Sequence, residues 1–112
     1  MNQNHQYFKT RIESLTRRAW GPSSNETTPW IMDGLFAQLL EECGELRSSI
    51  RDLTGRSLRP DKPLTTTTDV MYELGDVLVV LNRIALLYDL NPDTCMDLAL
   101  AKFESRLTKL GL

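Results

Sequence analysis

Apolar residues recur at intervals of three and four along most of this chain, and that spacing is the feature that most limits its fold. A helix places such residues on one face, whereas a strand needs strict alternation. The spacing predicts four helices, over residues 4–20, 29–53, 68–90 and 91–110. No segment alternates for long enough to form a strand. We therefore expect an all-α fold, a four-helix bundle that forms one domain over residues 1–112.

Turn-forming residues predict where these helices begin and end. Pro29 suits the first turn of the second helix, and Gly55 is a natural stop for it. The dipeptide Thr68-Asp69 offers a cap for the third helix. Asn91 and Pro92 provide a capping side chain and a first-turn proline for the fourth helix.

Composition narrows the class of protein. The chain has 13 Lys and Arg against 15 Asp and Glu, a net charge of −2, which does not support a nucleic-acid or membrane-surface partner. No apolar run reaches the length of about 20 residues that spans a bilayer, and residues 1–6 lack the pattern of a signal peptide. Cys43 and Cys95 fall inside helical patterns and are expected to be reduced thiols in the core. These features favour a cytoplasmic protein.

The last two predicted helices carry most of the apolar surface. Residues 68–90 are apolar nearly all round, which is typical of a central, buried helix. The core positions expected for the fourth helix are Met96, Ala99, Leu100, Phe103, Leu107 and Leu110.

Carboxylates interrupt the apolar faces of two helices. At about 100° per residue, Glu42 falls within the apolar stripe of the second helix, and Glu45 lies one turn further, at its edge. Glu73 and Asp76 share a face of the third helix with Val80. Residues three apart on a helix are neighbours, so each helix presents a pair of adjacent carboxylates.

Two such pairs facing each other would put four negative charges in a partly desolvated groove, which is unfavourable without a counter-ion. Oxygen ligands favour Mg²⁺, for which Mn²⁺ would substitute. The single histidine, His5, lies near the N-terminus and excludes most His-based metal sites and triads. The alternative is that these acids form ordinary ion pairs with Arg47, Arg51 or Arg83.

A glycine precedes the last acid of each pair, at Gly44 and Gly75. Glycine inside a helix costs about 1 kcal/mol relative to alanine. Its presence in both pairs suggests the close approach of another backbone or of a ligand.

A basic stripe runs along the fourth helix, formed by Lys102, Arg106 and Lys109. Opposite acidic metal ligands, such a stripe suits a polyphosphate. The alternative is an ordinary solvated flank near the C-terminal end of a helix.

Two stretches carry a resemblance to a known family. Residues 39–46 (LLEECGEL) and 72–78 (YELGDVL) are similar to the Glu-Glu-x-x-Glu and Glu-x-x-Asp elements of the MazG-like all-α nucleotide pyrophosphohydrolases. The fourth helix, with Lys102 and Arg106, resembles the basic closing helix of that superfamily. The likeness spans about residues 31–110.

The resemblance implies a bundle of the all-α NTP pyrophosphatase type, completed by assembly into a homodimer or homotetramer. The implied activity is Mg²⁺-dependent hydrolysis of a nucleoside or deoxynucleoside triphosphate to the monophosphate and pyrophosphate, with a house-cleaning role in the nucleotide pool. The implied site residues are the metal ligands Glu42, Glu45, Glu73 and Asp76, the outer-shell acid Glu41, which would orient or deprotonate water, the phosphate-binding Lys102 and Arg106, and Trp30 and Gln38 beside the base.

The segment between the two acid pairs is long for this family. Between Glu45 and Glu73 lie 27 residues, including a polar loop over residues 56–67 that would serve as a lid, a subunit contact or a substrate-selecting segment. Two rival hypotheses stand beside the enzyme. One is a non-catalytic bundle that binds metal or nucleotide, and the other is a helical protein-interaction module without a metal.

Overall fold

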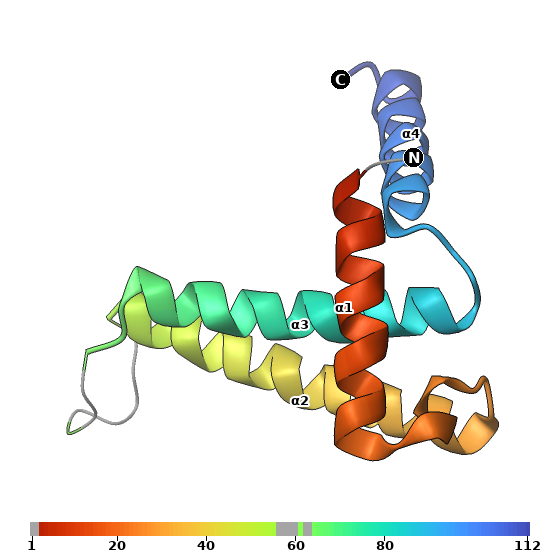
Figure 1. Ribbon diagram of the computed structural model, residues 1–112. Coiled ribbons are helices and arrows are strands. Elements are labelled where there is room, and N and C mark those ends of the chain that lie inside the picture. The colour runs from red at the N-terminus through yellow and green to blue at the C-terminus, as the bar shows by residue number, and fades with distance from the viewer. Residues whose placement is uncertain (1–2, 56–60, 62–63) are drawn as a thin grey trace. The chain divides into compact units, whose positions relative to one another are not determined.

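The computed structural model describes residues 3–55, 61 and 64–112. These residues form no strand, and their helices (Figure 1) are α1 (Gln3–Trp20), the short 3₁₀ helix η1 (Pro22–Asn25), α2 (Pro29–Leu53), α3 (Thr67–Leu87) and α4 (Pro92–Lys109). The predicted all-α class is therefore confirmed. Most of the expected polar loop, at residues 56–60 and 62–63, lies outside the described residues.

The ends of α2 and α4 follow the predicted signals. The Oγ1 atom of Thr28 accepts a hydrogen bond from the Ile31 backbone at 3.3 Å, directly before Pro29 at the start of α2. Gly55 follows α2 with φ of 77°, a left-handed conformation that glycine adopts without steric cost. Asn91 caps α4, because its Oδ1 accepts a hydrogen bond from the Asp93 backbone at 2.9 Å.

The predicted cap of α3 is wrong by two residues. Thr66 is the cap: its Oγ1 accepts from the Asp69 backbone at 3.2 Å, while Asp69 Oδ2 accepts from the Thr66 backbone at 2.8 Å. This reciprocal pair is a capping box. It satisfies two backbone donors at once and is therefore more favourable than a cap at Thr68.

The helix α3 also ends earlier than predicted. Asp89 has φ of 54°, and the Leu90 backbone donates to the Ala85 carbonyl at 2.9 Å. These features form a left-handed helix stop of the Schellman type, which closes the helix at Leu87 rather than at Leu90.

The chain divides into two compact units. The first contains α1, η1 and α4, and the second, Glu26–Ile84, contains α2 and most of α3. The expectation of a single domain over the whole chain stays a prediction.

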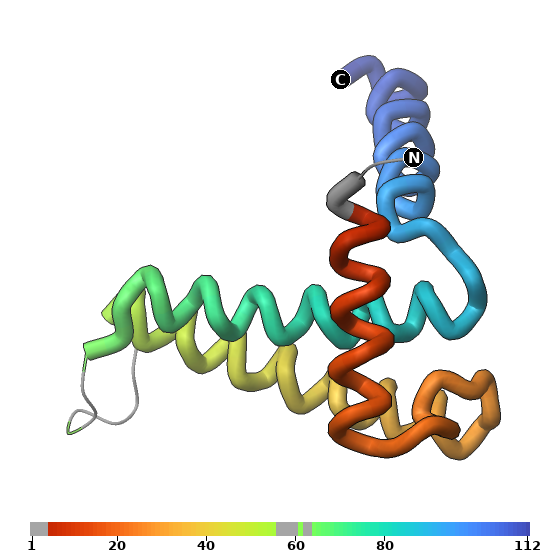
Figure 2. The backbone as a smooth tube through the Cα atoms, in the orientation of Figure 1, coloured from red at the N-terminus to blue at the C-terminus, as the bar shows by residue number. Residues whose placement is uncertain are grey.

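The second unit is an antiparallel pair of helices, α2 and α3, whose course the tube in Figure 2 follows. Met32 and Leu35 of α2 and Val77 and Val80 of α3 are buried and form its core. Val80 is 2% exposed, the most deeply buried apolar side chain of this group. The four side chains fix which face of each helix turns inward, and the carboxylate pairs lie on those same helices.

Polar contacts in the first unit stabilise the turn after α1. Thr16 and Ser24 are buried, and Ser24 Oγ donates to the Gly21 carbonyl at 2.6 Å and to the Thr16 carbonyl at 3.3 Å. Lys9 of α1 and Asp89 after α3 approach to 4.0 Å, a solvent-exposed ion pair that contributes little to stability.

Three burial predictions are wrong for the single chain. The helix α3 is not buried all round, because α2 covers only one side of it and Met71 and Tyr72 stay 66% and 72% exposed. In α4 no residue is buried, and of its expected core positions only Leu107 is even partly covered. Cys43 and Cys95 are free thiols as expected, but both are exposed, since they lie away from the covered helix faces.

No helix in the described part of the chain combines the length and apolar composition needed to cross a bilayer.

Candidate metal centre

Four carboxylates converge between the two helices of the second unit. The helix α2 supplies Glu42 and Glu45, one turn apart, and α3 supplies Glu73 and Asp76. One oxygen from each lies within 4.8 Å of one oxygen from every other. The predicted juxtaposition of the two acid pairs is therefore present in the structure.

The two inner carboxylates of this cluster are the less exposed ones. Glu42 and Glu73 are half-buried, whereas Glu45 and Asp76 are exposed. The Oε2 atoms of Glu42 and Glu73 are buried and have no hydrogen-bond partner among the described residues. Buried acceptors without a donor are costly, so both atoms call for a cation or a proton.

Burial is the main reason why the pKa of Glu42 and the pKa of Glu73 are both raised above 4.5. The charges of Glu45 and Asp76 raise both pKa values further, because each carboxylate disfavours a second charge beside it. A hydrogen bond with Glu45 also raises the pKa of Glu42 and of Glu73, since two carboxylates share a hydrogen bond only when one of them carries the proton. The cluster therefore holds more negative charge than it can stabilise alone.

Ion pairs with arginines are the alternative way to neutralise this cluster, and the described part of the chain tests it for Arg47 and Arg51. Arg47 and Arg51 form no ion pair with the four acids there. Arg83 is buried, and its Nη1 donates to Gln38 Oε1 at 3.3 Å. Burial also lowers the pKa of the Arg83 guanidinium.

The donor set fits a hard divalent cation. All four groups offer carboxylate oxygens, with no nitrogen or sulfur among them, which suits Mg²⁺ or Mn²⁺ better than zinc. A bound dication would give the orphaned Oε2 atoms a partner and offset the repulsion that raises the pKa values of Glu42 and Glu73.

The other predicted site residues lie outside this cluster. Glu41 is exposed on α2 and acts on Glu42 through its charge. Trp30 is 86% exposed in the first turn of α2. Lys102 and Arg106 lie on α4, in the other unit; Lys102 is exposed.

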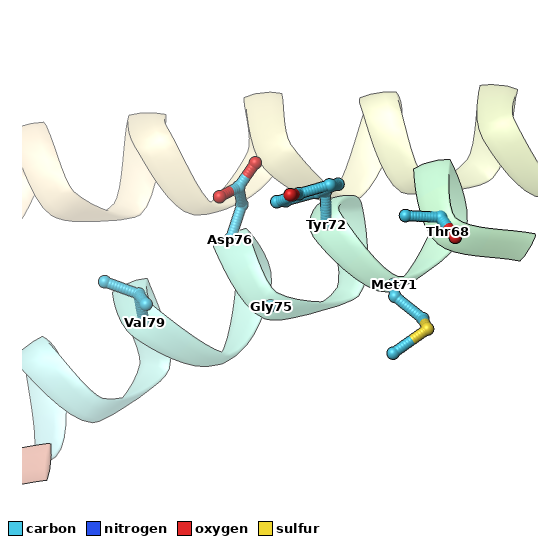
Figure 3. A pocket seen from close by; sticks show the side chains of 6 residues that line it. All are labelled: Thr68, Met71, Tyr72, Gly75, Asp76 and Val79. Carbon is cyan, nitrogen blue, oxygen red and sulfur yellow. The ribbon is translucent and has the colours of Figure 1, made fainter.

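A hollow of about 410 Å³ opens on α3 beside Asp76. Its lining residues (Figure 3) are Thr68, Met71, Tyr72, Gly75, Asp76 and Val79. The side chains of Tyr72 and Asp76 project from the same side of α3, and that of Met71 from another. Tyr72 is not among the predicted site residues, although it lies one turn before Asp76 on α3.

The close approach of another backbone that the two glycines suggest is absent from the described chain. A Cβ added at Gly44 or at Gly75 would meet no described atom within 4 Å, so the close approach of a ligand or of another backbone stays a prediction. Gly75 instead leaves open space in the lining of the hollow beside Asp76.

Fold and site together define an all-α protein that presents a carboxylate cluster suited to a divalent cation. The family model of the MazG nucleotide pyrophosphohydrolase domain matches residues 32–110 of this chain. That match covers both acid pairs and the whole of α4, and the chain therefore belongs to the MazG family. No curated protein and no solved structure matches the chain.

Proposed function

We propose that this protein hydrolyses a nucleoside or deoxynucleoside triphosphate to the monophosphate and pyrophosphate with Mg²⁺ as cofactor, and that it removes unwanted nucleotides from the cytoplasmic pool. The observation that carries the proposal is the convergence of four carboxylates, two with orphaned buried oxygens, in a chain of the MazG family. Such a cluster is stable with both pairs ionised only when a cation neutralises it.

The four acids of the cluster, Glu42, Glu45, Glu73 and Asp76, would hold the cation. When bound, Mg²⁺ supplies positive charge against the phosphate oxygens and makes a water molecule easier to deprotonate; Mn²⁺ would substitute. The protein contributes the fixed spacing of the four oxygens, which sets where the triphosphate is held relative to the attacking water.

Glu41 is the proposed general base. Its carboxylate is exposed and adjoins the cluster in sequence, so it remains available to accept a proton from water. The water oxygen forms a bond to the α-phosphorus while the bond from that phosphorus to the bridging oxygen breaks. Pyrophosphate leaves with the bridging oxygen, and the water proton passes to Glu41.

Substrate recognition would use side chains outside the cluster. Lys102 and Arg106 would bind phosphate oxygens, for which their positive charges suit them. Trp30 offers an exposed ring for the base, and Gln38 offers an amide one turn before Glu42. Tyr72, in the hollow beside Asp76, is a further candidate to stack on the base.

Assembly is part of the proposal. The apolar residues of α4 other than Leu107 are exposed in the single chain, and an uncovered apolar surface of this kind is typical of a subunit interface. We expect a homodimer or homotetramer in which the chain acts as one domain, with no nucleic-acid or membrane partner.

The test is pyrophosphate release from a panel of standard and modified nucleoside triphosphates, with Mg²⁺, with Mn²⁺ and with EDTA. We expect pyrophosphate and monophosphate in equal amounts, loss of both in EDTA, and loss of both in Glu42→Gln. If no nucleotide of the panel releases pyrophosphate and Mg²⁺ does not change the melting temperature, the proposal is contradicted and a protein-interaction module is favoured. A thermal shift without turnover would favour a non-catalytic metal-binding bundle.

A further inference from the structure

A buried arginine links the two helices of the metal centre. Arg83 of α3 is 9% exposed, and its Nη1 donates to Oε1 of Gln38 on α2 at 3.3 Å. The two residues are 45 positions apart in sequence, so this hydrogen bond joins α2 directly to α3 through side chains.

The link lies beside the carboxylate cluster. Gln38 precedes Glu42 by one turn of α2, and Arg83 follows Asp76 by two turns of α3. Long side chains on a helix lean toward its N-terminus, which carries the Arg83 guanidinium back along α3 in the direction of Asp76. The hydrogen bond between Arg83 and Gln38 therefore joins α2 to α3 next to the level of the four acids along the helix pair.

The acids themselves push the two helices apart. Each pair of carboxylates faces the other across the interface, and their mutual repulsion is relieved when α2 slides or tilts against α3. The apolar core of Leu35, Val77 and Val80 resists separation more than sliding, because apolar contact is non-directional. A hydrogen bond between two helices has a preferred distance and angle, so it opposes sliding.

We infer that Arg83 and Gln38 act together as positioning residues that hold α2 and α3 in the register at which the four carboxylates bind a divalent cation. This inference rests on the proposed function, since it needs the cluster to bind the metal. It assigns Gln38 a role through its Oε1 atom that does not depend on contact with the nucleotide.

Electrostatic repulsion alone predicts the opposite change in metal affinity when Arg83 is replaced by a neutral residue. A guanidinium near the centre repels a dication, so neutralising Arg83 should tighten metal binding if charge alone matters. A positioning role requires that the same change weakens binding, since the four oxygens lose their spacing. The direction of the change therefore separates the two explanations.

The experiment measures Mn²⁺ affinity of the full chain by the electron paramagnetic resonance signal of free Mn²⁺. Circular dichroism checks that each variant is folded at the temperature used. The variants are Gln38→Ala, Arg83→Met and the double variant. Arg47→Gln, which removes a cation from α2 outside the link, is the matched control for charge. We expect about tenfold weaker binding in each single variant, as for residues that orient metal ligands.

Non-additivity completes the test. Because the two side chains act as one link, the loss of Mn²⁺ affinity in the double variant should be smaller than the sum of the two single losses. Arg47→Gln should leave the affinity unchanged or slightly higher. If Arg83→Met does not fold, Gln38→Ala and the conservative Arg83→Lys decide the question, with Arg83→Lys expected to keep part of the affinity.

Unchanged or tighter Mn²⁺ binding in Gln38→Ala and Arg83→Met would overturn the inference, even where both variants melt at a lower temperature. Additive losses in the double variant would overturn it as well, since the residues would then act separately. Failure of the unmodified chain to bind Mn²⁺ would overturn the proposed function together with the inference.

Discussion

Glu42 and Glu73 carry the least favourable charges of the metal centre, because each is half-buried and faces three other carboxylates. Burial and those neighbours raise the pKa of both groups above 4.5 in the folded chain. The folded state then keeps its protons to higher pH than the unfolded state. The contribution of these two acids to the free energy of unfolding of the metal-free protein must therefore fall as pH rises from about 4.5 through the raised pKa values.

This linkage predicts how the melting temperature of the metal-free protein depends on pH. Measured in EDTA, the contribution of these two acids to stability should be fully present below a pH of about 4.5 and be lost as the pH rises through the raised pKa values. Saturating Mg²⁺ should reverse the trend, because the ionised cluster binds the cation and the bound state is stabilised by mass action. Calorimetry at several pH values, with EDTA and with Mg²⁺, checks both. A melting temperature in EDTA with no component that declines over this range would contradict the prediction.

Removing one charge from the cluster gives a second prediction at this scale. Glu42→Gln keeps the size of the side chain and ends its repulsion with Glu45 and Asp76, so the metal-free protein at neutral pH should melt a few degrees higher. The same variant should lose the thermal shift that Mg²⁺ produces. Glu104→Gln, which removes an exposed carboxylate of α4 outside the cluster, is the control and should change neither quantity.

At the scale of the element, local sequence signals predict where helices begin and end. They predict less well which other elements contact those helices. The caps at Asn91 and Gly55 depend on neighbours in sequence, and both are as predicted. The cap at Thr66 escapes prediction because its partner, Asp69, belongs to a residue type that caps helices itself. Helical spacing also predicts that Glu42 and Glu73 point inward, since a position on the apolar stripe follows from 3.6 residues per turn alone.

The interhelical link cannot be predicted in the same way. Arg83 and Asp76 share a face of α3, which favours a pair between them, whereas the Nη1 atom of Arg83 donates to Gln38 on α2. Spacing along one helix says nothing about which residue of another helix lies opposite. That depends on the register of α2 against α3, which the buried side chains of both helices fix together.

The two glycines of the acid pairs make a matched test of the hollow beside Asp76. Gly44→Ala and Gly75→Ala both place a methyl group in open space within a helix, so each should stabilise the protein by about 1 kcal/mol. Only Gly75 lines the hollow. We therefore expect Gly75→Ala to raise the KM for the nucleotide severalfold and Gly44→Ala to leave it unchanged. Equal KM values in steady-state kinetics would mean that the substrate does not use the hollow.

At the scale of the whole molecule, the sequence predicts apolar faces without saying what covers them. The pattern that predicts Phe103 and Leu100 as core residues is correct as a helical stripe, yet both are more than half exposed in the single chain. An apolar stripe indicates only that this face of the helix is covered, and does not identify the covering element. A second copy of the chain can cover this face as well as another helix of the same chain can, and a single sequence does not distinguish the two.

Phe103 provides the means to decide between these possibilities. It lies in the apolar stripe of α4 and is 59% exposed, and a charge placed there would be buried without a partner if another subunit covers it. We expect light scattering coupled to size-exclusion chromatography to show a dimer or tetramer for the unmodified chain and a smaller species for Phe103→Glu. Ser105→Glu places the same charge at an exposed position of α4 outside the stripe and should leave the assembly intact. A monomer for the unmodified chain would mean that the apolar stripe of α4 has some purpose other than self-association.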